Sequence, residues 1–470
     1  MSEQVRFLLD GQWETVGGID PTTTVLEWLR QTKGRTGTKE GCAEGDCGAC
    51  TVLVGSAESG RLVWRAINAC ILFLPMLHGK ALRTVESLGG SHPVQQAMVE
   101  HHGSQCGFCT PGIVMSLYGR SLRAVGTENA KVEDVLAGNL CRCTGYGPIL
   151  FAADAVPVEP EDDAAILAAL SRQPAESLRL PGWSSPATAD ELADLLVEKP
   201  DTRIVAGATD VGLWVTKQHR VLPEIVYVGG IADLSHIDET EDGLTLGASV
   251  RYGDAHAALS RIHPDLGELV RRIGAVQVRN AGTIAGNIAN GSPIGDMPPA
   301  LIALGASITL RRGAERRELA LEDFFLDYGK QDRKPGEFVE SVFIPRPTPD
   351  QIIRIVKLSK RFDSDISAVC GAIRLTLAKS RIAEARIAFG GMAGIPKRAR
   401  AAEAALTGSF WSQSACEDAA RALAEDFTPL TDVRGSSDYR LTAAGNILRR
   451  LWFEANGLGG SVLTTEAVDV

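Results

Sequence analysis

The stretch KEGCAEGDCGAC (residues 39–50) decides the fold of the N-terminal region, because it brings three cysteines into one glycine-rich loop. Its spacing is Cys42-x4-Cys47-x2-Cys50, and Cys70 follows as a fourth cysteine. This spacing is typical of a plant-type [2Fe–2S] cluster. A four-cysteine zinc site usually pairs two short knuckles, so three cysteines in one loop favour iron–sulfur over zinc. The interleaved glycines leave backbone N–H groups free to point at sulfur.

A second quartet, Cys106-x2-Cys109 with Cys141-x-Cys143, lies further along the chain. The Cys-x2-Cys pair is common to zinc and iron–sulfur sites, and Cys141-x-Cys143 is unusual for both, so the spacing alone leaves the metal open. Eight of the ten cysteines fall within the first 143 residues. The other two, Cys370 and Cys416, are interpreted as small buried apolar residues.

The bulk composition is that of a folded protein with several domains. With 470 residues, two to four domains are expected. A net charge of −10 argues against a nucleic-acid partner. The N-terminus MSEQVRFLLDG lacks the features of a signal peptide, and no apolar stretch is long enough to span a membrane. Clustered cysteines then fit a reducing, cytoplasmic location.

We expect an α+β multidomain fold. Residues 1–88 are predicted as a ferredoxin-like domain with strands at 5–9 and 51–54, a turn at Asp10-Gly11 and a helix beginning at Thr24. Cys70 is placed at the start of another helix. Residues 89–157 show helical apolar spacing in four segments and are predicted as a small four-helix bundle with its cysteines at the turns.

Proline and acidic residues mark 158–180 as a linker. A second α+β region is expected at 181–346, where Thr188 caps a helix and residues 203–207 form a buried strand. A last α+β domain is expected at 350–465, with strands first and helices later.

Two glycine-rich stretches stand out in the second half. IVAGATDVG (204–212) and VRNAGTIAGNIANGSPIGD (278–296) supply small side chains and free N–H groups of the kind that a pyrophosphate needs. Neither is a GxGxxG fingerprint or a P-loop, so no Rossmann dinucleotide site is indicated. Taken alone, either stretch is better explained as an ordinary turn.

The cysteine motifs carry a family resemblance. TKEGCAEGDCGACTV (38–52), GSQCGFCTPGIVMS (103–116) and LAGNLCRCTGYGPI (136–149) are similar to the paired iron–sulfur motifs of the molybdenum hydroxylases, which include xanthine dehydrogenase and aldehyde oxidase. The resemblance implies a [2Fe–2S] cluster at each quartet. It also implies that the second cluster lies nearer the molybdenum and the first nearer a flavin.

Both glycine-rich stretches resemble the FAD-binding segments of that family's non-Rossmann flavin domain. The resemblance implies FAD pyrophosphate contacts at Val205, Ala206, Gly207, Ala208, Thr209, Asp210, Val211, Gly212, Thr283, Ile284, Ala285, Gly286 and Asn287. It implies further FAD contacts at Ile273, Asp296, Val339 and Lys357. The charged segment 357–365 matches a loop near the flavin in relatives, although a solvated surface loop explains it equally well.

The resemblance extends over nearly the whole sequence and leaves nothing for a molybdopterin region. It is closest to the small iron–sulfur/FAD subunit of bacterial xanthine dehydrogenase. That implies a molybdopterin-binding large subunit as partner, an (αβ)2 heterotetramer, and no catalytic residue in this chain. Electrons from hypoxanthine or xanthine, oxidised to urate, would pass through the two clusters to FAD and then to NAD+. An aldehyde or N-heterocycle as substrate, oxygen as acceptor, and a non-catalytic redox module remain alternatives.

Overall fold

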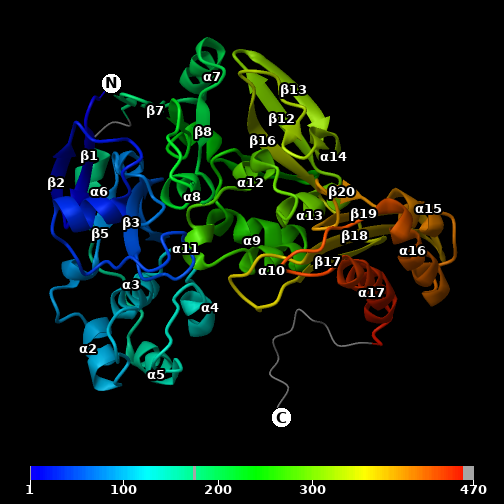
Figure 1. Ribbon diagram of the computed structural model, residues 1–470, viewed down its shortest axis with the longest axis horizontal. Helices are drawn as coiled ribbons and strands as arrows, with labels where there is room; N and C mark the ends of the chain where they lie inside the picture. Colours follow the sequence, from blue (N-terminus) through cyan, green and yellow to red (C-terminus); the bar gives the residue numbers. More distant parts are fainter. Residues whose placement is uncertain (1, 173–175, 459–470) are drawn as a thin grey trace. The chain divides into compact units, whose positions relative to one another are not determined.

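The computed structural model describes residues 2–172 and 176–458 (Figure 1). The chain divides into two compact units. The first comprises Met1–Asp233, Arg251–Asp254 and Gly274–Thr283, and the second comprises Leu234–Val250, Ala255–Ile273 and Ile284–Val470. Among the described residues, no helix has both the length and the apolar character to cross a bilayer.

The first unit begins with a five-stranded sheet in the order β2-β1-β5-β3-β4. The strands are β1 (Val5–Leu9), β2 (Gln12–Val16), β3 (Thr51–Glu58), β4 (Arg61–Asn68) and β5 (Ala81–Arg83). Asp10 and Gly11, both at positive φ, form the expected two-residue turn between β1 and β2. Thr24 caps α1 (Val25–Glu27), which continues as a π-helical turn, Trp28–Thr32. The predicted ferredoxin-like sheet is confirmed.

Cys70 does not lie at a helix start, contrary to the prediction. β4 ends at Asn68, and Cys70 lies in the turn that follows, before a 3-10 helix at Leu74–Leu77. The run from Ile71 to Phe73 is buried throughout. Such a continuous apolar run has no periodicity that distinguishes a buried turn from a helix.

The four predicted helices of the second region are present. They are α2 (Pro93–Glu100), α3 (Thr110–Ser121), α4 (Val132–Leu136) and α5 (Gly147–Ala155). Met98, Tyr118 and Ile149 are buried in one core with Leu53 and Trp64 of the sheet. The bundle and the sheet therefore share apolar packing within the first unit.

The segment 158–180, expected as a linker, contains a helix. This helix, α6 (Ala164–Ser171), buries Leu170 in the core shared by the sheet and the bundle. Asp163, directly before α6, accepts a hydrogen bond from Trp64 Nε1 of β4 at 2.6 Å, which also holds the helix against the sheet. The prolines of the segment lie outside the helix, so the apolar run AAILAAL could form it.

The rest of the first unit contains a four-stranded sheet in the order β6-β7-β9-β8. Its elements are β6 (Leu178–Leu180), β7 (Trp183–Ser185), α7 (Ala189–Glu198), β8 (Arg203–Val205), α8 (Val211–Thr216), β9 (Ile225–Tyr227) and α11 (Val276–Arg279). Thr188 caps α7 as predicted. β8 was expected to be buried, but it is an edge strand, and only Val205 in it is buried.

The second unit contains a five-stranded sheet in the order β10-β11-β16-β12-β13. The strands are β10 (Ile237–Glu239), β11 (Gly243–Gly247), β12 (Ser307–Arg312), β13 (Glu315–Ala320) and β16 (Phe338–Pro345), with a small hairpin of β14 (Phe325–Asp327) and β15 (Lys330–Gln331). The accompanying helices are α9 (Tyr252–Ile262), α10 (Pro264–Arg271), α12 (Ile284–Asn290), α13 (Met297–Leu304) and α14 (Leu321–Phe324).

The C-terminal region is strand-rich first and helical later, as predicted. β17 (Gln351–Leu358), β18 (Val369–Ala378), β19 (Arg381–Gly390) and β20 (Lys397–Arg398) form one sheet, and α15 (Arg400–Leu406), α16 (Gln413–Asp426) and α17 (Ser437–Ala455) follow. Cys370 and Cys416 are buried, as expected of small apolar residues. The α+β multidomain class is confirmed, whereas the exact domain limits stay predictions.

Candidate functional site

The first cysteine quartet comes together at the loop before β3. The thiol of Cys42 lies beside those of Cys47 and Cys70, and the thiol of Cys70 also lies beside that of Cys50. The neighbouring thiols lower the pKa of Cys42, and the same contacts raise the pKa of Cys47 and of Cys70. The four cysteines thus form one group that favours thiolate at Cys42.

Backbone N–H groups of the loop point at sulfur. Those of Glu44, Asp46 and Cys47 lie 3.4, 3.4 and 3.3 Å from Cys42 Sγ. Gly45 and Gly48 take positive φ, which lets the chain reverse around the cysteines. Such N–H···S contacts stabilise negative charge on a thiolate-bound cluster. The loop therefore fits an iron–sulfur cluster, as the spacing predicted.

The second quartet comes together between the N-terminus of α3 and the loop before α5. The thiol of Cys106 lies beside that of Cys143, and the thiol of Cys109 lies beside that of Cys141. Burial and the contact with Cys141 raise the pKa of Cys109 to about 12. Cys106 and Cys143 are exposed, whereas Cys141 is buried. This site is therefore open to its surroundings on one side.

Tyr146 orders the second loop and was missed from the sequence. Its hydroxyl accepts from the N–H of Cys141 at 2.8 Å and donates to the carbonyl of Asn139 at 3.1 Å. Thr144 Oγ1 lies 3.2 Å from Cys141 Sγ. The only signal in the sequence was the position of Thr144 and Tyr146 directly after Cys143.

The grouping of cysteines bears on the kind of metal. Among the described residues, no three His, Cys, Asp or Glu side chains converge as ligands of a single ion would. In a [2Fe–2S] cluster each iron takes only two protein ligands, so the four sulfurs need not converge on one point. In the second quartet, the thiols of Cys106 and Cys143 lie near each other, as do those of Cys109 and Cys141. The donor sets fit two binuclear clusters.

In the first unit, the first glycine-rich stretch forms a strand–turn–helix between β8 and α8. A Cβ on Gly207 would lie 2.0 Å from the carbonyl oxygen of Ala281 and 2.8 Å from the nitrogen of Gly282. Backbone therefore meets backbone here, which only glycine permits. Val205, Ala208, Gly212 and Thr283 are buried, Ala206, Gly207, Thr209 and Val211 are half-buried, and Asp210 is exposed. The turn is a close-packed cradle of small residues, as a pyrophosphate site needs.

The part of the second glycine-rich stretch that lies in the second unit, residues 284–296, forms α12 and the turn after it. Ile284 and Ala285 are buried, while Gly286 and Asn287 are half-buried. Asn287 Oδ1 is a buried acceptor without a hydrogen-bond partner among the described residues. A buried acceptor left unpaired costs free energy, so this atom fits a donor supplied by a bound ligand. The stretch therefore fits the predicted FAD contact.

Two further predicted FAD contacts pair with each other. Lys357 Nζ donates to Asp296 Oδ2 at 2.6 Å, and both side chains are at most 8% exposed. Ser367 donates to the other carboxylate oxygen of Asp296. Val339 is buried in β16, and Ile273 is half-buried after α10. Lys357 and Asp296 therefore form a buried salt bridge. Contact of these four residues with FAD stays a prediction.

The charged segment 357–365 is a surface loop after Lys357. Phe362 is 47% exposed, and the guanidinium of Arg272 lies 4.6 Å from its ring centroid. Arg271 lies 3.5 Å from Asp363. The loop is therefore tethered to the end of α10 by cation–π and ionic contacts.

Removal of Lys357 tests the buried pair. We expect Lys357→Met to lower the free energy of unfolding by about 3 kcal/mol, because Asp296 keeps a buried, uncompensated charge. Chemical denaturation of wild type and variant measures the loss. Lys379→Met, in the exposed turn before β19, is the control and should change stability little. Equal stability of all three proteins would contradict the importance of the pair.

Four domain families match the chain. Residues 7–74 match the 2Fe-2S iron-sulfur cluster binding domain, and residues 84–154 match the [2Fe-2S] binding domain. Residues 176–347 match the FAD binding domain in molybdopterin dehydrogenase, and residues 354–455 match the CO dehydrogenase flavoprotein C-terminal domain. The chain belongs to the molybdenum hydroxylase family. Its domains are those of the family's iron–sulfur and flavin region.

Similar proteins agree with this assignment. The chain is 30% identical to xanthine dehydrogenase/oxidase of Mus musculus over 92% of its length and 37% of the relative's. It is 31% identical to xanthine dehydrogenase of Emericella nidulans, over 96% of the chain and 38% of the relative. The chain thus spans less than two-fifths of the length of these curated relatives.

Two solved structures share the fold. Carbon monoxide dehydrogenase from Hydrogenophaga pseudoflava is 28% identical, with a TM-score of 0.55, over 59% of this chain and 98% of that one. Quinoline 2-oxidoreductase from Pseudomonas putida 86 is 27% identical, with a TM-score of 0.53, over 58% and 96%.

Proposed function

We propose that the chain is the iron–sulfur/FAD electron-transfer subunit of a xanthine dehydrogenase. The observation that carries the proposal is the presence, in one compact unit, of two cysteine quartets and the small-residue turn at Gly207. The names of the curated relatives support the purine substrate. When bound, two [2Fe–2S] clusters would supply one-electron relays and FAD would supply two-electron exchange.

The first quartet is packed against the helix that follows the flavin turn. Thr216 Oγ1 donates to Ala43 O at 2.7 Å, and Lys217 Nζ donates to Cys42 O at 2.6 Å. A Cβ on Gly212 would lie 2.9 Å from Ile71 Cβ, next to Cys70. These contacts support the order proposed for electron flow: second quartet, first quartet, then FAD.

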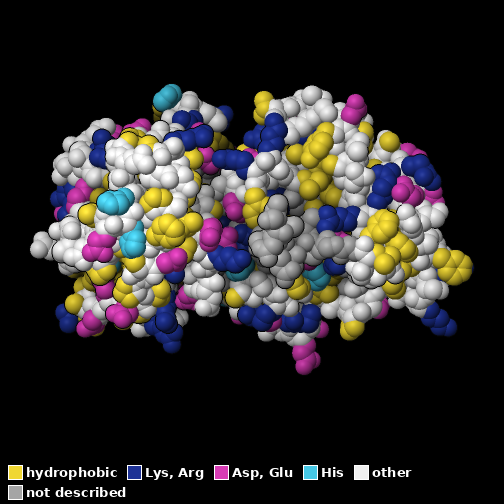
Figure 2. Space-filling view, turned by 90° about the horizontal axis from the view of Figure 1, so that it is seen from below, with side chains coloured by type: hydrophobic (Ala, Val, Ile, Leu, Met, Phe, Trp, Pro, Cys, Tyr) yellow, Lys and Arg dark blue, Asp and Glu magenta, His cyan; other side chains and the backbone are white. Residues whose placement is uncertain are grey.

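The exposure of the second quartet is evidence for a partner subunit. Cys106 and Cys143 are exposed, and Phe108 and Leu140 beside them are each 48% exposed. Val99 of α2 and Phe151 of α5 are also exposed. Figure 2 shows hydrophobic side chains scattered over this face of the molecule. A molybdopterin-binding large subunit in an (αβ)2 heterotetramer would cover this apolar surface and deliver electrons to the exposed quartet.

In this proposal, the residues of this chain would hold the cofactors, and none would act on the substrate. Cys42, Cys47, Cys50 and Cys70 would hold the first cluster, and Cys106, Cys109, Cys141 and Cys143 the second. Residues 205–212 and 283–287, with Ile273, Asp296, Val339 and Lys357, would hold FAD. NAD+ would accept hydride beside the loop that contains Phe362. This loop belongs to the charged segment 357–365, which resembles a loop near the flavin in relatives, and Phe362 is exposed.

Analysis of the purified complex tests the proposal. We expect about four irons and one FAD for each copy of this chain, with a large subunit that co-purifies. Reduction by xanthine followed by reoxidation with NAD+ should occur without oxygen. Fewer than about three irons, or no FAD, would overturn the cofactor assignment.

Two other functions remain as outcomes of the same experiment. Turnover of aldehydes or N-heterocycles in preference to xanthine would indicate another substrate class. The similarity to quinoline 2-oxidoreductase is the observation that favours this alternative. A protein with clusters but no large subunit and no turnover would be a non-catalytic redox module. Reoxidation by oxygen and not by NAD+ would replace the proposed acceptor.

A further inference from the structure

We propose that the hydrogen bond from the N–H of Leu140 to the carbonyl of Cys47 is the electron route between the two quartets, and that Asn139 and Gln277 hold it in place. The inference rests on the proposed function, because it needs both clusters to be present. It assigns that function a path and two positioning residues.

The bond joins the two quartets directly. Leu140 N and Cys47 O are 3.0 Å apart. Cys47 belongs to the first quartet, and Leu140 is covalently bonded to Cys141 of the second. From Sγ to Sγ, the path crosses the covalent atoms of Cys47, Leu140 and Cys141 and only one hydrogen bond. One electron leaves the second cluster and one arrives at the first; no proton moves and no bond is made or broken.

The two loops approach as closely as backbones can. A Cβ on Gly48 would lie 2.0 Å from Gly138 O, and a Cβ on Gly112 would lie 2.1 Å from Gly48 O. A side chain at Gly48 or Gly112 would push these backbones apart, and one at Gly138 would meet Ala275 and Gln277. The three glycines therefore belong to the contact between the quartets, in addition to allowing the chain to turn.

The buried side chain of Asn139 joins the two loops by a hydrogen bond. It is 2% exposed, and its Nδ2 donates to Gly48 O at 3.2 Å. Its Oδ1 accepts from Ser116 Oγ at 2.7 Å. Asn139 thereby ties the residue before Leu140 to the residue after Cys47.

Gln277 donates into the same contact from α11. It is 1% exposed, and its Nε2 lies 3.2 Å from Thr51 Oγ1, 3.2 Å from Ser116 Oγ and 3.1 Å from Asn139 Oδ1. Thr51 already donates its hydroxyl hydrogen to Gly48 O. Ser116 donates its own to Asn139. All three atoms must therefore accept, so only the amide nitrogen of Gln277 can face them.

A second contact between the loops is weaker. The ring of Phe108, 48% exposed, lies 3.4 Å from the position of a Cβ on Gly41. Gly41 has no side chain at that position, so the ring only approaches the first loop there. The approach of Phe108 to the first loop is therefore the competing route, and transfer that depends on Phe108 but not on Leu140 would contradict the proposal.

The test compares Leu140→Pro with Leu140→Ala in the assembled complex. Proline removes the N–H donor, whereas alanine keeps it and trims an exposed side chain. Rapid reduction of the complex, followed by EPR of each cluster, gives the rate of transfer between them. We expect the proline variant to be slower than the alanine variant by on the order of tenfold or more, as for small displacements at other reacting centres. The midpoint potentials of both clusters should be unchanged.

Gln277→Met keeps the test decisive if proline prevents cluster assembly. It preserves the shape of the side chain and removes the donor, and we expect slower transfer with full iron content. Gln218→Met, at an exposed position of the same unit, is its control. Transfer at the wild-type rate in Leu140→Pro or Gln277→Met with intact clusters would overturn the route, as would a loss of rate in Phe108→Ala alone. Failure of the proposed function would instead appear in the wild type, as missing clusters or no reduction by xanthine.

Discussion

Gly207→Ala is expected to purify with little or no FAD while keeping the iron of both clusters. The added Cβ would lie 2.0 Å from Ala281 O and 2.4 Å from Ala281 C, so two backbone segments would have to separate. Neither atom belongs to a flexible side chain that could turn away. We expect the flavin absorbance per protein to fall by about tenfold, because a displacement near 1 Å is large for a preorganised site.

The control for this prediction is Gly230→Ala in the same unit. A Cβ on Gly230 would meet its nearest atom, in Tyr227, at 3.6 Å, which is ordinary van der Waals contact. It should retain FAD at the wild-type level. Full FAD content in Gly207→Ala would show that this turn does not hold the flavin. Loss of iron as well as FAD would show instead that the whole unit had failed to fold.

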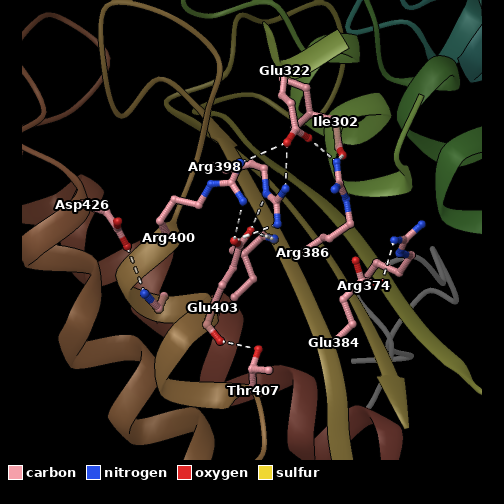
Figure 3. Close-up of polar contacts among 12 residues, drawn as sticks. Ile302, Glu322, Arg374, Glu384, Arg386, Arg398, Arg400, Glu403, Thr407 and Asp426 are labelled. Carbon is pink, nitrogen blue, oxygen red and sulfur yellow. Dashed lines mark hydrogen bonds and ion pairs between the residues drawn. The ribbon is translucent and has the colours of Figure 1, made fainter. Parts of the chain in front are cut away.

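Glu322→Gln is expected to destabilise the second unit strongly. Figure 3 shows Glu322 facing Arg386, Arg398 and Arg400. Arg398 donates to Glu322 at 2.8 Å and Arg400 at 3.1 Å, and Arg386 forms a third ion pair with the same carboxylate. The side chains of Glu322, Arg386 and Arg398 are at most 16% exposed. Without the carboxylate, the buried guanidinium of Arg386 loses its ion-pair partner, so we expect a loss of about 3 kcal/mol in the free energy of unfolding.

Glu403 completes this cluster without replacing Glu322. It accepts from Arg398 at 2.8 and 2.9 Å and from the N–H of Ile387 at 2.8 Å, so its oxygens are already engaged (Figure 3). Asp418→Asn is the matched control, because its pair with Arg421 is more than half exposed on both sides. Exposed pairs contribute about 0–1 kcal/mol. Similar unfolding curves for the two variants would contradict the prediction.

The same cluster gives stability a defined dependence on pH. Burial alone would raise the pKa of Glu322, but the hydrogen bond from Arg398 and the charge of Arg386 outweigh it and lower the pKa. A carboxyl with a lowered pKa in the folded state stabilises the fold above its ordinary pKa, and it loses that contribution as the pH falls through its folded-state value. The stability difference between wild type and Glu322→Gln should therefore shrink in acid. A difference that is constant with pH would count against this assignment.

The sequence predicted local structure well where one strong local signal was present. Asp10-Gly11 predicted the first hairpin, and Thr188 predicted the start of α7, because turn and capping chemistry act within a few residues. It failed at Cys70, where an apolar run fits a buried turn as well as a helix. It also failed at 158–180, because proline and acidic residues indicate a linker there, whereas the apolar residues between them form α6.

The side chains that support the site could not be predicted from their neighbours in the chain. Tyr146, Asn139 and Gln277 are ordinary polar residues in the sequence, and only the folded chain gives them buried partners. Gln277 in particular lies more than 130 residues from each of its acceptors. The orphaned acceptor on Asn287 is likewise visible only once its surroundings are packed.

The sequence by itself determined where cysteines and glycines cluster, because the spacing of these residues is a local property of the chain. It therefore determined the two quartets, the small-residue turn at Gly207 and the α+β domain order. Only the tertiary structure decided how the quartets meet, through backbone contacts at Gly48, Gly112 and Gly138 and one hydrogen bond from Leu140 to Cys47. The reason is physical. Each of these contacts joins residues far apart in the sequence, and the residues around one partner contain no signal that identifies the other.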